Sequence, residues 1–152
     1  MRQLKLKDII GYLPYGLAMK YIDNTVTIFY SLPALEPNIP ILRPLSDLYR
    51  TITHNGKEIV PIIELAKIAY PEGDFQVVNI KGSEIYAQYR NIFRFFYNEG
   101  LFQKMDGYGK TYPLNDQIVF FDYLNELKID YRGLIDEGLA ININTLDFNL
   151  YK

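Results

Sequence analysis

The chain has 152 residues, a formal net charge of −2 and no cysteine. That length suits one domain with a sizeable core, whereas the lack of cysteine excludes disulfides, thiolate nucleophiles and thiolate metal sites within the chain. A net charge this small gives no strong field for duplex nucleic acid, so no duplex partner is expected. The single histidine also excludes a multi-histidine metal site within one chain.

The start of the chain, MRQLKLKDIIGYLPYG, mixes charges into a short apolar segment, unlike a secretory signal peptide. No apolar run approaches the roughly 20 residues needed to cross a bilayer. We therefore expect a cytoplasmic protein with no membrane partner. Aromatic residues make up 15% of the chain, with 14 tyrosines. Because tyrosine joins a large ring to a polar tip, this composition favours ligand stacking or oligomerisation.

The first third of the chain predicts a short helix followed by a β-hairpin. Apolar residues at helical spacing favour a helix over residues 4–13, which Pro14 ends. Two β-rich runs, residues 16–22 and 25–32, flank an Asp-Asn pair that tolerates left-handed backbone angles. The four prolines between residues 33 and 44 then favour an extended connection within one domain.

The middle of the chain alternates helical and strand signals. A brief helix is expected over residues 46–52, and Asn55-Gly56 predicts a tight turn into a strand over residues 57–60. Pro61 suits the first turn of a helix that ends near residue 70, and residues 75–80 favour another strand.

The longest internal helix is expected over residues 84–98, with Gly82 and Ser83 as its turn and N-cap. On a helical wheel, one side is apolar and a second stripe consists of Tyr86, Arg90, Arg94 and Tyr97. Guanidinium groups pair with phosphate oxygens, and tyrosine rings stack on bases or ribose. This stripe is therefore a candidate nucleotide site, and the alternative is a solvated or protein-facing helix surface.

The segment Gly107-Tyr108-Gly109-Lys110-Thr111 resembles part of a phosphate-binding loop. Lys104 occupies the place of a required glycine, and Tyr112-Pro113 follows where a helix should begin, so the full pattern fails. We expect a mobile loop or hairpin over residues 101–112. Tyr108 and Lys110 could close over a ligand, and the alternative is a plain glycine-containing turn.

The end of the chain predicts a helix over residues 116–128 and a short helical turn over 134–137. Residues 139–146 favour a short final strand or a docked extended tail. Core packing is the main interpretation of its apolar residues. In all, the sequence predicts an α+β fold, with one compact domain spanning residues 1–152, a small mainly antiparallel sheet and about four helices.

Three segments carry a resemblance to known proteins. The segments KLKDIIGYLPYGL, ILRPLSDLYRTITHNGKEIVPI and IDYRGLIDEGLAININTL resemble uncharacterised small proteins of phages and prophages of gut Bacteroidales. Residues 73–111 lie outside this similarity. The resemblance implies a phage origin and a bacterial host cell, and it supplies no catalytic residue.

No catalytic constellation is predicted. His54 occupies a turn with no nucleophile identified near it, and five C-terminal carboxylates are scattered along the chain: Asp116, Asp122, Asp130, Asp136 and Glu137. Neither a metal site nor a cofactor is predicted.

We therefore expect a non-catalytic protein that binds a small anionic ligand, with a host-defence nucleotide signal as the example that a phage origin suggests. The expected ligand-binding residues are Tyr86, Arg90, Arg94, Tyr97, Tyr108 and Lys110. A homo-oligomer is expected because a small protein can build a pocket between chains. The alternatives are a protein-interaction factor that inhibits a host enzyme and a phosphodiesterase-type enzyme.

Overall fold

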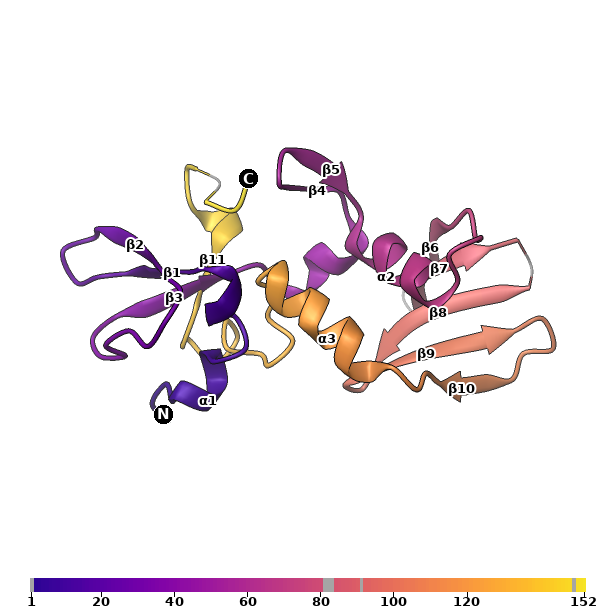
Figure 1. Ribbon diagram of the computed structural model, residues 1–152, viewed down its shortest axis with the longest axis horizontal. Coiled ribbons are helices and arrows are strands. Elements are labelled where there is room, and N and C mark those ends of the chain that lie inside the picture. The colour runs from indigo at the N-terminus through magenta and orange to yellow at the C-terminus, as the bar shows by residue number, and fades with distance from the viewer. Residues whose placement is uncertain (1, 81–83, 91, 149) are drawn as a thin grey trace. The chain divides into compact units, whose positions relative to one another are not determined.

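The computed structural model describes residues 2–80, 84–90, 92–148 and 150–152 (Figure 1). The expected turn and cap at Gly82 and Ser83 lie outside these residues. The chain divides into two compact units. The first unit comprises Met1–Leu45 and Asp122–Lys152, and the second comprises Ser46–Phe121. The expectation of one domain stays a prediction.

The first unit is built on a four-stranded sheet with the order β11-β3-β1-β2. Its elements are α1 (Leu6–Ile9), η1 (Leu13–Tyr15), β1 (Leu17–Lys20), β2 (Val26–Phe29), β3 (Ile39–Leu42), β11 (Ile141–Asn142) and η3 (Ile143–Thr145). The predicted hairpin is confirmed, because β1 and β2 pair in antiparallel register. Strand β3 was not predicted, and it occupies part of the proline-rich connection. It pairs in parallel with β11.

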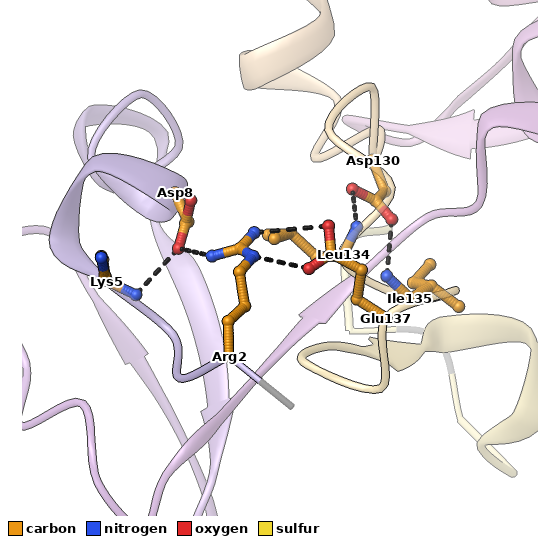
Figure 2. Close-up of polar contacts among 7 residues, drawn as sticks. All are labelled: Arg2, Lys5, Asp8, Asp130, Leu134, Ile135 and Glu137. Atoms are coloured by element: carbon orange, nitrogen blue, oxygen red, sulfur yellow. Dashed lines mark hydrogen bonds and ion pairs between the residues drawn. The ribbon is translucent and has the colours of Figure 1, made fainter.

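Polar contacts join the start of the chain to its C-terminal part within the first unit (Figure 2). The Arg2 guanidinium donates to Asp8 at 2.7 Å and to Glu137 at 2.6 Å. The Asp130 carboxylate accepts from the backbone N–H groups of Leu134 and Ile135 at 2.9 and 2.7 Å. Asp130 therefore closes a turn, and residues 134–137 form turns where the sequence predicts a helical turn.

The second unit contains a five-stranded antiparallel sheet with the order β10-β9-β8-β7-β6 and the separate hairpin β4-β5. Its elements are η2 (Leu45–Tyr49), β4 (Ile52–His54), β5 (Lys57–Ile59), α2 (Pro61–Ala69), β6 (Gln76–Ile80), β7 (Glu84–Tyr89), β8 (Phe93–Asn98), β9 (Leu101–Asp106) and β10 (Thr111–Pro113). The predicted turn at Asn55-Gly56, the helix beginning at Pro61 and the strand over residues 75–80 are confirmed.

The predicted helix over residues 84–98 is wrong, because this segment forms the strands β7 and β8. Its apolar residues fit a helical wheel, but isoleucine, tyrosine and phenylalanine dominate them, and these residues suit a pleated sheet better than a helix. Pairing with β6 on one side and β9 on the other overrides the local periodicity. The residues of the expected helical stripe therefore lie on two strands and the turn between them.

One face of the five-stranded sheet carries an aromatic core. Phe95 lies 5.6 Å from Phe102 and 5.5 Å from Phe120, as measured between ring centroids. Tyr70, just after α2, stacks on Phe93 at 5.6 Å. Because alternate residues of a strand point to the same face, Phe93 and Phe95 lie on one face of the sheet, and the core of the second unit packs against that face.

Helix α3 (Gln117–Glu126) confirms the predicted C-terminal helix. Among the described residues the chain has three α-helices where about four were expected, and it also has the short 3-10 segments η1, η2 and η3. Helices and mostly antiparallel strands are both present, so the α+β class is confirmed in a strand-rich form. No helix in the described part is both long enough and apolar enough to cross a bilayer.

Candidate functional site

Strands β7 and β8 separate partway along their length. Their pairing covers Tyr89↔Phe93, Gln88↔Arg94 and Ala87↔Phe95. From Tyr86 back to Glu84, β7 pairs only with β6 among the described strands. From Phe96 on to Asn98, β8 pairs only with β9 among them. The described parts of β7 and β8 thus form a fork, with one half of each strand unpaired toward the other.

A pocket of about 360 Å³ lies at this fork, and we call it the fork pocket. Its lining residues are Tyr49, Ile85, Tyr86, Arg94, Phe96, Tyr97, Asn98 and Met105. They include neighbours along one strand, such as Phe96 and Tyr97, whose side chains leave opposite faces of the sheet. Residues from both faces can line one pocket because the strands are apart here.

The charge of the fork pocket comes from Arg94. Its Cζ atom lies 4.8 Å from the ring centroid of Tyr86, a cation–π geometry. Its Nη1 atom also lies 3.9 Å from Sδ of Met105. Tyr86 is buried, so its ring offers a fixed platform beneath the guanidinium. Among the described side chains that line the pocket, Arg94 is the one cation and none is a carboxylate.

Tyr49, at the end of η2, also lines the fork pocket. Burial, followed by the neighbouring Tyr97, raises the pKa of Tyr49 to about 12, and a hydrogen bond with the Tyr97 backbone offsets part of this effect. The phenol is therefore neutral at physiological pH. A neutral hydroxyl can donate or accept one hydrogen bond at the pocket wall.

Three of the predicted site residues meet at the fork pocket, namely Tyr86, Arg94 and Tyr97. Arg90 does not line it. Arg90 lies at the β7–β8 turn with a positive φ of 48°, and its guanidinium lies 5.2 Å from the ring centroid of Tyr89. It lines a second, more open depression together with Glu72 and Asp74.

Tyr108 and Lys110 lie in the turn between β9 and β10, and neither lines the fork pocket. The Asp106 carboxylate accepts from the backbone N–H groups of Tyr108 and Lys110 at 2.9 and 3.0 Å. The Tyr108 side chain is 99% exposed, and Nζ of Lys110 lies 5.1 Å from the ring centroid of Tyr112. Asp106 thus orders this turn by local contacts.

The sequence did not predict five lining residues: Tyr49, Ile85, Phe96, Asn98 and Met105. For the residues of β8, an interpretation of Phe93–Asn98 as a strand would have grouped Arg94, Phe96 and Asn98 on one face. Nothing in the sequence places Tyr49 near this hairpin, because their contact depends on the folded arrangement of the second unit.

The other candidates for chemistry stay apart. The His54 ring lies 3.2 Å from the side-chain amide of Asn55. Among the described residues, no group of three or more histidine, aspartate or glutamate side chains could hold a metal ion. Comparisons with protein-family models, curated proteins and solved structures found no match. The resemblance to phage proteins therefore stays a prediction.

Proposed function

We propose that the protein is a non-catalytic binding protein whose fork pocket takes a small ligand with a flat ring and one anionic group, such as a mononucleotide. The observation that carries this proposal is the Arg94 guanidinium held over the buried Tyr86 ring in a pocket of about 360 Å³. Guanidinium pairs with phosphate or carboxylate, and the surrounding rings stack on a flat group.

The size and charge of the fork pocket favour a ligand with a single phosphate. Its volume of about 360 Å³ is close to the lower end of the range for small-molecule sites, which begins at about 300 Å³. Arg94 is the one cation among the described lining side chains, so the site balances little negative charge. A triphosphate calls for more cationic groups or a metal ion.

The proposed role is sequestration, in which binding lowers the free concentration of a nucleotide signal by mass action. The choice of a host-defence signal rests on the resemblance to phage proteins. Sequestration requires affinity and no chemical step, which agrees with the lining residues, since aromatic, amide and guanidinium groups bind well without providing a nucleophile and base pair.

Titration calorimetry with a nucleoside monophosphate, the matching nucleoside and the matching triphosphate tests this proposal. We expect the monophosphate to bind most tightly, because the nucleoside lacks the anionic group and the triphosphate brings unbalanced charge. Arg94→Gln should weaken monophosphate binding about 10- to 100-fold, the loss expected for one charge-assisted hydrogen bond. The ligand is then recovered after denaturation and weighed by mass spectrometry.

Arg90→Gln is the matched control, since Arg90 belongs to the same hairpin but lies outside the fork pocket. It should bind like the unmodified protein. Equal losses in both variants would remove the fork pocket as the site. Recovery of a chemically altered ligand would instead identify an enzyme, and the absence of binding to any member of the panel would favour a protein partner.

A further inference from the structure

Strand β2 forms one edge of the four-stranded sheet in the first unit. It pairs with β1 on one side, and among the described residues no strand pairs with its other side. Large apolar side chains around it face solvent: Ile22 is 82% exposed, Tyr30 70%, Leu32 68% and Ile28 43%. Natural edge strands usually carry charges or proline against unwanted pairing. This edge therefore has the character of an interaction surface.

The backbone of β2 presents hydrogen-bonding groups to that open side. The N–H of Tyr21 donates to the carbonyl of Thr25 at 2.8 Å, so the Tyr21–Thr25 pair is hydrogen-bonded. In an antiparallel ladder hydrogen-bonded pairs alternate with pairs that are not, which directs the N–H and C=O groups of Thr27 toward β1. Those of Val26 and Ile28 then point away from β1. They offer donors and acceptors for another strand.

The side chains of this edge are compatible with a second copy of themselves. Between Asn24 and Leu35 the sequence has no Lys, Arg, Asp, Glu or His. Two such strands can therefore meet in antiparallel register without placing like charges opposite each other. We propose that β2 pairs with β2 of a second copy of this chain across a twofold axis at Thr27, which joins the two sheets into one.

The register centred on Thr27 follows from the exposed apolar residues. It places Val26 opposite Ile28 of the second copy, and it brings Ile22 of one copy toward Leu32 of the other. It also places Asn24 opposite Tyr30, whose ring carries a hydroxyl, whereas a shift of the axis to Val26 or Ile28 places Asn24 opposite the aliphatic Ile28 or Leu32. A twofold interface uses the same patch on both chains, so the pairing closes at two copies. This surface shares no residue with the fork pocket and does not depend on the proposed ligand.

Sedimentation velocity over a wide concentration range tests the pairing. The full chain should pass from monomer to dimer as its concentration rises. Ile28→Lys and Tyr30→Lys each bring two like charges into the shared edge and should weaken dimerisation at least 10-fold, with unchanged circular dichroism. Ile118→Lys is the matched control, because Ile118 is 78% exposed and belongs to α3 and to the second unit, whereas β2 belongs to the first. It should dimerise like the unmodified chain.

The lack of cysteine allows a direct test of the register. Thr27→Cys places two cysteines opposite each other at a non-hydrogen-bonded pair, where Cα atoms are about 4.5 Å apart, within disulfide reach. Mild oxidation should give a covalent dimer. Thr25→Cys is the control, because its two copies lie on the order of 14 Å apart in this register. A monomer at every concentration, equal crosslinking of both variants, or dimerisation unaffected by Ile28→Lys would overturn the proposal.

Discussion

The hydroxyl of Tyr151, a residue near the C-terminus, accepts a hydrogen bond from the backbone N–H of Ala18 at 2.9 Å. The same hydroxyl donates to the carbonyl of Ile41 at 2.8 Å. Strands β1 and β3 pair through Met19↔Pro40 and Lys20↔Ile39, and this ladder ends before Ala18 and Ile41. Tyr151 thus satisfies one buried backbone group of each strand where their own pairing has stopped.

Tyr151→Phe should destabilise the protein by about 1–3 kcal/mol, because it leaves a buried N–H and a buried C=O without this partner. Urea unfolding followed by circular dichroism measures the loss. Tyr108→Phe is the matched control, since the Tyr108 side chain is 99% exposed. Removal of its hydroxyl should leave stability unchanged, because an exposed hydroxyl bonds to water in both the folded and the unfolded state. If both variants unfold at the same urea concentration, the hydroxyl of Tyr151 does not hold the two strands.

Lys128 is a buried cation in the first unit. Its Nζ atom donates to the Glu126 carbonyl at 2.8 Å and lies 5.1 Å from the ring centroid of Tyr151. Burial, with a smaller effect of the nearby Arg43 charge, lowers the pKa of Lys128 to about 8. In the unfolded chain the pKa of lysine is about 10.4, so the unfolded state binds more protons between these two values.

The free energy of unfolding should therefore rise with pH from about 8 upward, as folded Lys128 loses its charge before the unfolded chain does. The slope from this one group is at most about 1.4 kcal/mol per pH unit. Lys128→Met should remove that slope, and Lys57→Met, a change at an exposed lysine of β5, should keep it. Urea unfolding at a series of pH values below the tyrosine range measures it. Identical slopes in all three proteins would contradict the prediction.

The turn between β8 and β9 has two positive φ angles in succession, as has the turn between β4 and β5, but its first residue is less suited to them. Asn55 and Gly56 have φ values of 49° and 74°, and Glu99 and Gly100 have φ values of 50° and 80°. Asparagine tolerates the left-handed region better than glutamate. Glu99→Asn should therefore stabilise the protein by about 0.5–1 kcal/mol in urea unfolding.

Glu58→Asn is the control for the Glu99 variant, because it makes the same change within β5, where a left-handed residue is not required. It should give no gain. A gain of equal size in both variants would mean that the lost charge, rather than the turn geometry, is the cause.

The turns between β4 and β5 and between β7 and β8 show which parts of the fold the sequence could predict. Asparagine followed by glycine is typical of a tight turn, so the turn at Asn55-Gly56 and the strand after it were predicted, whereas β4 before it was not. The β7–β8 turn contains Arg90 in a left-handed conformation, which local propensity does not signal, so a helix was predicted across it. The structure of residues that fit both a helical and a strand pattern depends on the strands they pair with. Here those strands are β6 and β9, which a helical wheel of residues 84–98 leaves out.

The candidate site was predictable only in part for the same reason. Tyr86 and Arg94 were grouped because of helical spacing, and they meet across two paired strands instead. Arg90 fits the same helical stripe but lies at the turn, on a different depression. Tyr49 could not be assigned from spacing at all, because long-range packing within the second unit brings it to the pocket.

Asp8 links the first helix to the start of the chain, and its charge should make the stability of the protein depend on acid. Burial raises the pKa of Asp8, but hydrogen bonds from the Arg2 guanidinium at 2.7 Å and the Lys5 N–H at 2.8 Å outweigh it and hold the pKa below its ordinary value. A carboxylate of this kind stabilises the fold above its unfolded pKa of about 3.9 and loses that effect as pH falls through the folded value.

Asp8→Asn should therefore lower the free energy of unfolding by about 1–2 kcal/mol near neutral pH, and the difference from the unmodified protein should shrink in acid. Urea unfolding at neutral pH and in acid measures the change. Asp136→Asn is the control, because Asp136 is an exposed carboxylate of the same unit, and it should leave the free energy of unfolding near its original value. Arg2→Gln should show the same pH dependence with a smaller amplitude, because it removes one of the two donors that keep the Asp8 carboxylate ionised and leaves the Lys5 N–H. A loss that stays constant from neutral to acid pH would show that the Asp8 side chain acts through its shape and not through its charge.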